Sequence, residues 1–583
     1  MWKCISFLLV LIITFSGSPI AMAFSESEEI TLAEYSKQLS ELTQMYGVSN
    51  IGGTAEENID LVDLPLNRLI IRTSDNQKFI EDCNAIAKIE GYNGIHIMQY
   101  TSEYMAEQAY NYYSGLSTVE SVEFDFCFNV TEPVPESIEY KYDKEYLSWG
   151  SNAIKTNDAL TYATYLAENA PEIVVAVIDT GIDYDHEFLK GRIVDSGVDL
   201  VEYDGVPDDD NSHGTHVAGI IVDNTAENVK VSAYKVLDSK RIGYYSTICA
   251  AVDLSIEHKV DIINMSLSGP KSLNGFSLFE ECINKAIYNN IPVIVAAGND
   301  ECDASDVCPA SNTNVITVAS STDYNAPSSF SNFGECVDVA APGSRINSCI
   351  KDNLYGSKSG TSMAAPFVSA AAAFLKTLNP LYSPEAIEKI IKECVLVPPN
   401  WNTKYGTGIL NFSVIVKNYI TEKPKIFIND DKKAEIYTAA ENADIYYTTD
   451  GSKPIIGVSA LYKEPIDISD AVSINAIVCE NGKYPSILSI LRINWQEKIT
   501  IRYKGTKNMR LSSNAIILSC YSSDENVAVA DKREKTIYGV SKGGTVIVVN
   551  LKTGQKITYI VSVEYELWQL VIIYFFFGFL WYI

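Results

Sequence analysis

Long apolar runs alternate with amphipathic stretches through the middle of the chain, between residues 145 and 420. Four runs are apolar almost throughout, as expected for strands buried on both faces, and they cover residues 172–181, 228–238, 260–269 and 291–300. Apolar positions at helical spacing lie between them, at 246–259 and 279–290. This alternation predicts an α/β fold with a doubly wound, mainly parallel sheet, whose functional residues lie at the carboxyl ends of the strands.

A second, shorter alternation occupies residues 66–128. Strand patterns at 66–73, 95–101 and 119–126 are separated by helical patterns at 76–90 and 102–116. We therefore expect a small α+β domain, with an open sheet and two helices on one of its faces. The prolines and charges of residues 129–150 predict an exposed connector after this domain.

Beyond residue 423 the pattern changes to short strands separated by turn residues, which predicts two small all-β modules at 424–494 and 497–564. Residues 567–583 form an apolar, aromatic tail without a charge. Its length is at the short limit for a membrane helix, and no Lys or Arg flanks it. We interpret the tail either as a membrane or envelope anchor or as a segment that packs on a β-module.

The N-terminus has the three parts of a secretory signal. Lys3 supplies a positive charge, residues 5–15 are apolar, and residues 21–23 ("AMA") fit a small-residue cleavage site. The apolar core is too short to span a membrane comfortably, so residues 1–23 are predicted to be a signal peptide. The protein is therefore expected to be secreted, and its tail would attach it to the cell surface if the tail is an anchor.

Composition and cysteine content narrow the class further. Hydrophobic residues make up 47% of the 583 positions, and the formal net charge is −29, which excludes nucleic acid as a partner. Of the 12 cysteines, 11 follow the predicted signal, and the absence of a C-x-x-C pair argues against structural zinc. Cys302 with Cys308, and Cys336 with Cys349, are close enough in sequence for local disulfides, although spacing does not fix their connectivity.

Three segments combine residue types that can activate a hydroxyl. Asp179 ends the first apolar run, His213 lies where "SHGTHVAG" turns into a helix, and Ser362 opens an Ala-rich helical stretch. An imidazole that is neutral near pH 7 can take the serine proton, and a buried carboxylate fixes the imidazole tautomer. The unpaired N–H groups of a helix N-terminus and the side-chain amide of Asn299 can hold a developing oxyanion.

These motifs resemble those of the subtilisin-like serine proteases (subtilases, peptidase family S8). The matching segments read "VIDTGID", "SHGTHVAG", "AAGN" and "GTSMAAP", and the resemblance spans about residues 149–411. It implies Asp179, His213 and Ser362 as the catalytic residues and Asn299 as the oxyanion-hole side chain. It implies that no cofactor is required for the chemistry.

The flanking regions resemble modules found beside such proteases. Residues 66–128 resemble an I9-type prodomain in the order of their elements, which implies a propeptide over 24–140 that inhibits the enzyme until it is cut off between about 130 and 148. Residues 445–454 resemble a chitobiase C-terminal, FN3-like module, and residues 522–549 resemble a bacterial Ig-like group 2 module. Both modules would contact cell wall or carbohydrate, or act only as spacers.

In subtilases the substrate peptide adds as an extended strand between two enzyme segments. The corresponding positions here are Gly243 within residues 239–245, and Ser266, Leu267, Ser268 and Gly269. Lys240 and Arg241 would favour acidic side chains upstream of the cut, or would only keep an exposed edge soluble. Val307 would narrow the primary pocket if it lines that pocket.

Some residues allow a second interpretation. His213 and His216 are three residues apart, so a metal pair is the rival of a catalytic base beside a packed histidine, but the spacing supplies no third ligand. The remaining histidines are interpreted as structural: His96, His186 and His258. Five carboxylates near the motifs would hold a structural calcium ion or form a solvated acidic loop: Asp183, Asp185, Asp208, Asp209 and Asp210.

Together these features predict a secreted serine endopeptidase, made as a self-processed preproprotein with its catalytic domain over 141–420. It would cleave protein or peptide substrates through an acyl-enzyme, with its own propeptide as inhibitor. Two alternatives stay open. One is a surface-binding, adhesin-like scaffold with a silent protease domain, and the other is a processing protease dedicated to a single substrate.

Overall fold

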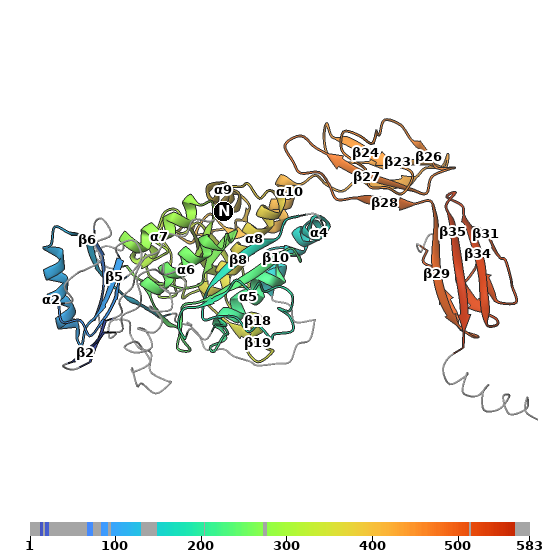
Figure 1. Ribbon diagram of the computed structural model, residues 1–583. Helices are drawn as coiled ribbons and strands as arrows, with labels where there is room; N and C mark the ends of the chain where they lie inside the picture. The colour runs from blue at the N-terminus through green and yellow to red at the C-terminus, as the bar shows by residue number, and fades with distance from the viewer. Residues whose placement is uncertain are drawn as a thin grey trace, which may run out of the picture. The chain divides into compact units, whose positions relative to one another are not determined.

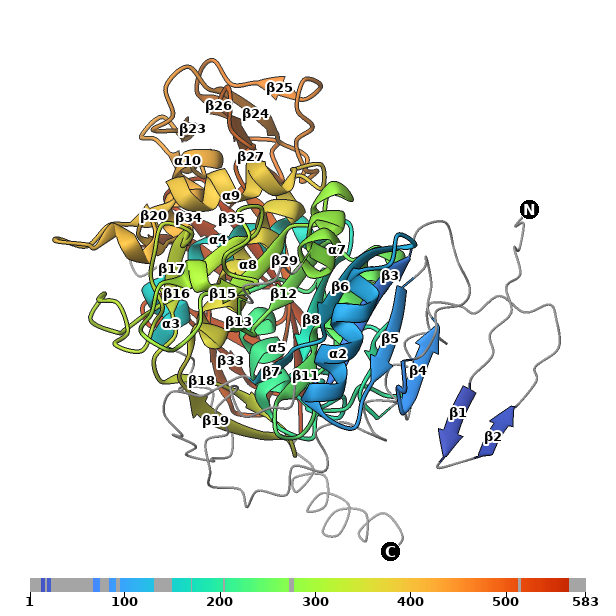
Figure 2. The same cartoon turned by 90° about the vertical axis from the view of Figure 1, so that its left-hand side faces the viewer.

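The computed structural model describes residues 12–15, 18–21, 67–73, 83–90, 95–129, 149–168, 170–202, 205–271, 277–511 and 515–565. The chain divides into two compact units, Met1–Ile415 and Val416–Ile583, whose elements are labelled in Figures 1 and 2. The tail predicted at 567–583 lies outside the described residues, as does most of the predicted signal peptide and connector.

A nine-stranded sheet forms the middle of the first unit, in the order β20-β21-β17-β16-β14-β12-β8-β10-β9. Every pair is parallel except β20 with β21. The bounds are β8 Ile173–Asp179, β9 Val198–Asp199, β10 Val229–Lys235, β12 Ile262–Met265, β14 Val293–Ala296, β16 Ile316–Ser321, β17 Val339–Pro342, β20 Val395–Leu396 and β21 Ile409–Leu410. The doubly wound, mainly parallel sheet is confirmed, and the four apolar runs contain β8, β10, β12 and β14.

Helices cover both faces of this sheet because the chain reverses its winding direction. From β8 it passes through α5 (His213–Asp223) to β10, and from β10 through α6 (Tyr245–Glu257) to β12 on the other side of β8. Since such crossovers are right-handed, α5 and α6 lie on opposite faces. The long α8 (Thr361–Leu378) packs beside α5, and α7 (Ser277–Tyr288) packs beside α6. The reversal places the switch point of the sheet at the carboxyl ends of β8 and β12, where doubly wound proteins hold their functional residues.

Shorter elements complete the first unit. Its other described helices outside the N-terminal sheet are α3 (Trp149–Ala153), α4 (Thr156–Ala167) and α9 (Pro384–Glu393), with 3-10 turns at Ala304–Asp306 and Thr403–Tyr405. Helix α10 (Phe412–Tyr419) crosses the boundary between the two units. Three antiparallel pairs join β7 (Cys127–Asn129) to β11 (Ile242–Tyr244), β13 (Gly269–Pro270) to β15 (Val307–Cys308), and β18 (Ile346–Ile350) to β19 (Leu354–Lys358).

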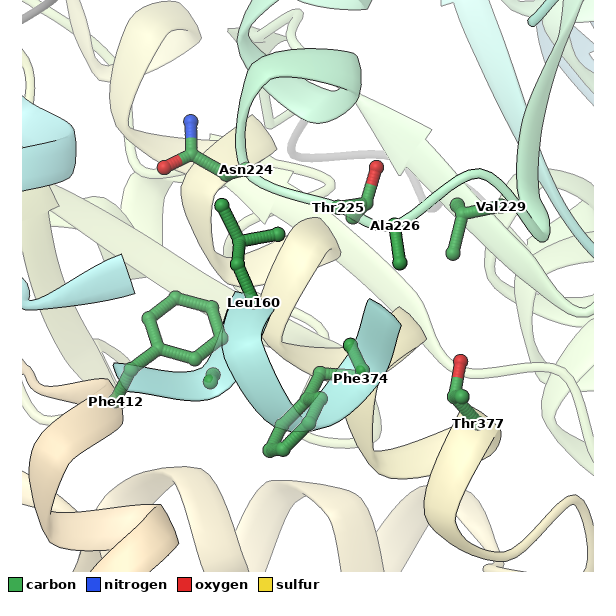
Figure 3. A pocket seen from close by; sticks show the side chains of 10 residues that line it. Leu160, Asn224, Thr225, Ala226, Val229, Phe374, Thr377 and Phe412 are labelled. Carbon is green, nitrogen blue, oxygen red and sulfur yellow. The ribbon is translucent and has the colours of Figure 1, made fainter. Parts of the chain in front are cut away.

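The core around α8 is closely packed. Of the described helices, α8 is the one long and apolar enough to cross a membrane, and 94% of that stretch is buried inside the protein. Beside it lies a cavity of ≈ 10 Å³, drawn in Figure 3, with Asn224, Thr225 and Thr377 next to Phe374 and Phe412. A space of this size holds about one water molecule, so the cavity is a packing feature and no ligand site.

The small N-terminal sheet is antiparallel, in the order β4-β5-β3-β6. Its strands are β3 (Arg68–Thr73), β4 (Ala87–Glu90), β5 (Ile95–Gln99) and β6 (Val119–Phe124), and α2 (Glu103–Ser114) lies across one face (Figure 2). A further hairpin, β1 (Ile12–Phe15) with β2 (Ser18–Ala21), lies within the residues predicted as signal peptide.

The helix predicted at 76–90 is wrong where the structure describes it. Residues 83–84 form a turn and Ala87–Glu90 is strand β4, while residues 76–82 lie outside the described residues. Strand β4 pairs with β5 from Ala87 opposite Gln99 to Glu90 opposite His96. Long-range pairing therefore decides this segment, because tertiary contacts override a weak local helical pattern.

The second unit contains two groups of strands. In the first, β22 (Lys425–Ile428), β23 (Lys433–Tyr437) and β26 (Ile466–Asp467) face a sheet of β24 (Asp444–Thr448), β25 (Ala460–Leu461), β27 (Ser473–Cys479) and β28 (Ser489–Arg492) around one apolar core. The second group has a four-stranded sheet and a three-stranded sheet around a second apolar core. The four-stranded sheet contains β29 (Asn494–Arg502), β31 (Ile517–Ser522), β34 (Gly543–Leu551) and β35 (Lys556–Glu564), and the three-stranded sheet contains β30 (Thr506–Asn508), β32 (Ala528–Asp531) and β33 (Thr536–Gly539). Both are all-β, as predicted.

Candidate active site

An aspartate and a histidine form a buried pair at the carboxyl end of β8. Asp179 is the last residue of this strand, and His213 is the first residue of α5. The His213 Nδ1 lies 2.7 Å from the Asp179 Oδ1, and both side chains are fully buried. In a neutral imidazole this hydrogen bond places the proton on Nδ1 and leaves Nε2 as an acceptor. The Nε2 atom is buried and has no hydrogen-bond partner.

Ser362 lies in the first turn of α8, the helix that packs against α5. Its hydroxyl donates a hydrogen bond of 3.1 Å to the carbonyl oxygen of Ser266, and the Ser266 hydroxyl donates one of 2.8 Å to the carbonyl oxygen of Ser362. The structure therefore brings Ser362 together with Ser266, and it holds the Ser362 hydroxyl on that carbonyl rather than on His213.

Asn299 follows β14 and also reaches the first turn of α8. Its Oδ1 accepts hydrogen bonds from the backbone N–H of Thr361 at 2.8 Å and from the Thr361 hydroxyl at 3.0 Å. Since Oδ1 is held in this way, the Nδ2 group is the donor that the side chain presents near Gly360 and the backbone N–H of Ser362. Two N–H donors at a helix N-terminus are suited to binding an anionic oxygen.

Of the two segments predicted to hold a peptide, one joins β12 to β13 and the other lies in β11. Ser266 and Leu267 are fully buried behind α8, and Gly269 pairs in β13 with Cys308 of β15, next to Val307. Gly243 lies in β11, where it pairs with Phe128 of β7. A side chain at Gly243 would collide with the carbonyl oxygen of Val236, which explains the glycine. The edge strand β11 is thus occupied by the N-terminal part of the same chain.

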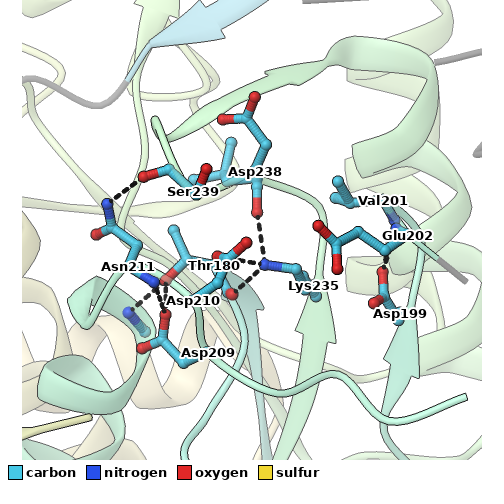
Figure 4. Close-up of polar contacts among 12 residues, drawn as sticks. Thr180, Asp199, Val201, Glu202, Asp209, Asp210, Asn211, Lys235, Asp238 and Ser239 are labelled. Carbon is cyan, nitrogen blue, oxygen red and sulfur yellow. Dashed lines mark hydrogen bonds and ion pairs between the residues drawn. The ribbon is translucent and has the colours of Figure 1, made fainter. Parts of the chain in front are cut away.

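Asp209 is a residue of this site that sequence reasoning assigned only to a calcium-binding or solvated cluster. Its carboxylate accepts hydrogen bonds from the Thr180 hydroxyl at 2.9 Å and from the backbone N–H of Asn211 and of Ser212, also at 2.9 Å (Figure 4). It also accepts from the Thr215 backbone at 2.9 Å and hydroxyl at 2.6 Å. Asp209 therefore ties the residue after Asp179 to the start of the helix that carries His213.

A buried lysine supports the same loop from the strand beside β8. Lys235 is 1% exposed, and its Nζ donates to the Thr180 carbonyl oxygen at 2.9 Å and to the Asp210 Oδ1 at 2.7 Å (Figure 4). The carboxylates of Asp209 and Asp210 are therefore engaged by donors of the protein. The residues that the structure describes contain no group of three or more metal-ligating side chains.

The other histidines have structural partners. The His216 Nε2 lies 2.9 Å from the carbonyl oxygen of Ile346 and 3.2 Å from that of Gly356, so this nitrogen donates to the protein and is not open to a metal ion. His186 contacts a backbone carbonyl, His258 a tyrosine hydroxyl and His96 a threonine hydroxyl.

The local disulfides suggested by sequence proximity are absent among the described residues. Cys302, Cys308, Cys336 and Cys349 are all free thiols. Cys349 is 1% exposed and packs against Gly219 of α5. Closeness in sequence did not predict a Cys336–Cys349 pair, because the hairpin strand β18 buries Cys349 against α5.

The fold is a doubly wound α/β fold, and at its switch point a buried carboxylate holds a histidine. The subtilase family (Peptidase_S8) matches residues 170–408, and subtilisin NAT of Bacillus subtilis subsp. natto is 35% identical over 275 residues, 45% of this chain and 69% of the relative. The chain belongs to the subtilase family.

Three further similarities cover smaller parts of the chain or of the relative. Alkaline serine exoprotease A of Vibrio alginolyticus is 37% identical over 249 residues, 42% of this chain, and the match spans 46% of that relative, about half its length. A solved structure of a cold adapted subtilisin-like serine proteinase is 35% identical, with 41% of this chain and 89% of that chain covered and a TM-score of 0.39. The Fn3-associated family matches residues 434–489, in agreement with the FN3-like prediction for the first β-module.

Proposed function

We propose that this protein is an exported serine endopeptidase that uses Asp179, His213 and Ser362, with Asn299 in the oxyanion hole. The observation that carries the proposal is the fully buried Asp179–His213 pair, 2.7 Å apart, with Nε2 left without a partner. A buried imidazole that is held in one tautomer, and whose second nitrogen is vacant, suits a general base. Membership of the subtilase family supports the same roles.

The reaction begins when the Ser362 hydroxyl turns from the Ser266 carbonyl to His213. The Nε2 atom takes the proton as Oγ attacks the carbonyl carbon of the substrate, and Asp179 stabilises the imidazolium. The Asn299 Nδ2 and the Ser362 backbone N–H bind the oxygen that becomes negative. His213 then gives its proton to the departing amine, and a water molecule repeats the sequence to release the acid.

The N-terminal domain would act as an internal inhibitor that the enzyme removes. Its strand β7 pairs with β11, the edge predicted to receive an extended peptide, so the two cannot use that edge together. Strand β7 ends at Asn129, so we place the self-cleavage site C-terminal to that residue, within the interval from about 130 to 148. After the cut, loss of β7 would free the edge for substrate.

The test is covalent labelling of Ser362 by a fluorophosphonate in protein from the culture medium. We expect one labelled peptide that contains Ser362, and loss of label in Ser362→Ala. The matched control is Ser369→Ala, which removes another buried hydroxyl of α8 and should keep the label. Ser362→Ala should also accumulate as the uncut chain. Absence of label in folded wild-type protein would contradict the proposal.

A further inference from the structure

Two buried thiols meet across the neighbouring helices α6 and α7. Cys249 of α6 is 9% exposed and Cys282 of α7 is 6% exposed. The Cys282 Sγ lies 4.0 Å from the Cys249 carbonyl oxygen. A hydrogen bond between the two side chains that favours the neutral Cys249 thiol, together with burial, raises the pKa of Cys249 well above its ordinary value. The two side chains are therefore in contact, although both are free thiols here.

An ion pair one turn after the two cysteines shows how α6 and α7 are aligned. Lys285 follows Cys282 by three residues, Asp253 follows Cys249 by four, and the Lys285 Nζ lies 2.6 Å from the Asp253 Oδ1. Residues at these spacings lie on the same face of a helix. The two helices thus run in the same direction with the cysteines opposite each other. A disulfide requires two cysteines at short range on facing elements. Cys249 and Cys282 lie at opposed positions of these two helices, with the Cys282 Sγ against the Cys249 backbone.

We propose that Cys249 and Cys282 form a disulfide in the exported protein, joining α6 to α7. The inference rests on the export proposed above and is independent of peptidase activity. Disulfides persist in the oxidising conditions outside a cell, where a low-molecular-weight disulfide can serve as oxidant.

The bond forms by two exchanges with that oxidant, R–S–S–R. One cysteine thiolate attacks a sulfur of the oxidant and displaces one RSH, and the second cysteine thiolate then displaces the other. The two protein thiols lose two protons and two electrons, which leave with the two RSH molecules. The step belongs to folding, because both thiols are buried in the finished structure, where an oxidant does not reach them.

The proposed disulfide would join the two helices, α6 and α7, that contact the N-terminal domain. The first turn of α6 is bound by Asp125, which accepts from the Ser246 N–H at 3.0 Å and from the Ser246 hydroxyl at 2.7 Å. On α7, Glu281 pairs with Arg72 at 2.6 Å. A covalent link between the two helices would keep both attachment points in one geometry.

Peptide mapping of protein from the culture medium tests the proposal. The protein is blocked with N-ethylmaleimide, unfolded and digested with trypsin without reduction. We expect residues 242–259 cross-linked to residues 272–285, because each of these tryptic peptides holds one cysteine, and we expect dithiothreitol to separate them. Both peptides recovered separately in alkylated form would overturn the inference.

Two variants sharpen the result. Cys282→Ser should leave Cys249 alkylated, whereas Cys349→Ser, which removes another buried thiol, should leave the cross-link intact. Retention of the chain inside the cell would contradict the proposed export instead. The purified full chain, refolded with glutathione disulfide, would then give the same mapping result and decide the disulfide separately.

Discussion

The contact between the N-terminal domain and the edge of the candidate site offers a quantitative test. Arg68 of β3 and Asp125 form an ion pair of 2.8 Å whose side chains are 1% and 0% exposed. The Arg68 guanidinium also lies 4.0 Å from the centre of the Tyr244 ring in β11, and Asp125 binds Ser246 at the start of α6. Undocking of the domain would expose both charges to water, so the ion pair affects the free energy of docking directly.

Arg68→Met should weaken docking strongly because it leaves the Asp125 carboxylate buried without its cation. Loss of one member of a buried ion pair costs about 3–5 kcal/mol. We expect the lower end, about 3 kcal/mol, since Ser246 still donates two hydrogen bonds to the carboxylate. At about 1.4 kcal/mol per factor of ten, the undocked population should rise roughly 150-fold.

Hydrogen–deuterium exchange on the uncut Ser362→Ala chain measures this population. The amides of Ile242–Tyr244 should lose about 150-fold of their protection in Arg68→Met. Arg72→Met is the matched control, because its pair with Glu281 is 25% and 58% exposed and such pairs contribute at most about 1 kcal/mol, or fivefold. Amides of β16 should not change in either variant. Equal losses of protection in the two variants would refute the reasoning.

Three further outcomes follow from the same contacts. Asp179→Asn should lower kcat/KM about 10⁴-fold on a chromogenic peptide, because an amide no longer holds His213 in the required tautomer, and a loss below tenfold would contradict the assigned role. Burial raises the pKa of Asp223 in the folded protein. Its contribution to stability is therefore greatest below the unfolded pKa, about 4, and declines as pH rises from there through the folded pKa, and Asp223→Asn should remove that decline in a series of thermal melts at increasing pH. Gly219→Ala should lower the free energy of unfolding by about 1–3 kcal/mol in urea, because its Cβ would collide with the Ser348 hydroxyl, and an unchanged midpoint would exclude this clash.

Much of the larger fold could be predicted from the sequence because its strands are buried on both faces. A continuous apolar run such as 172–181 has few alternatives to a central strand once helical patterns separate it from the next run. The small N-terminal domain was harder. Residues 87–90 carry a weak helical pattern, yet they form an edge strand because β5 supplies partners that local periodicity does not encode.

For the candidate site, sequence motifs identified the predicted catalytic residues but not the residues that hold them in place. Asp179, His213 and Ser362 stood out by residue type and position, and the structure places the first two in one buried pair. The role of Asp209 was missed. Its only signal was its position four residues before His213, and an acidic cluster reads equally well as a solvated loop.

The sequence by itself determined the α/β class, the position of each motif at a strand or helix end, and the two all-β modules, because these follow from local periodicity and turn chemistry. The tertiary structure decided which distant groups meet. It paired β7 with β11, placed Cys282 beside Cys249, and hydrogen-bonded Lys235 to the Thr180 carbonyl oxygen. These contacts join residues far apart in the chain, and only packing and strand register bring such residues together.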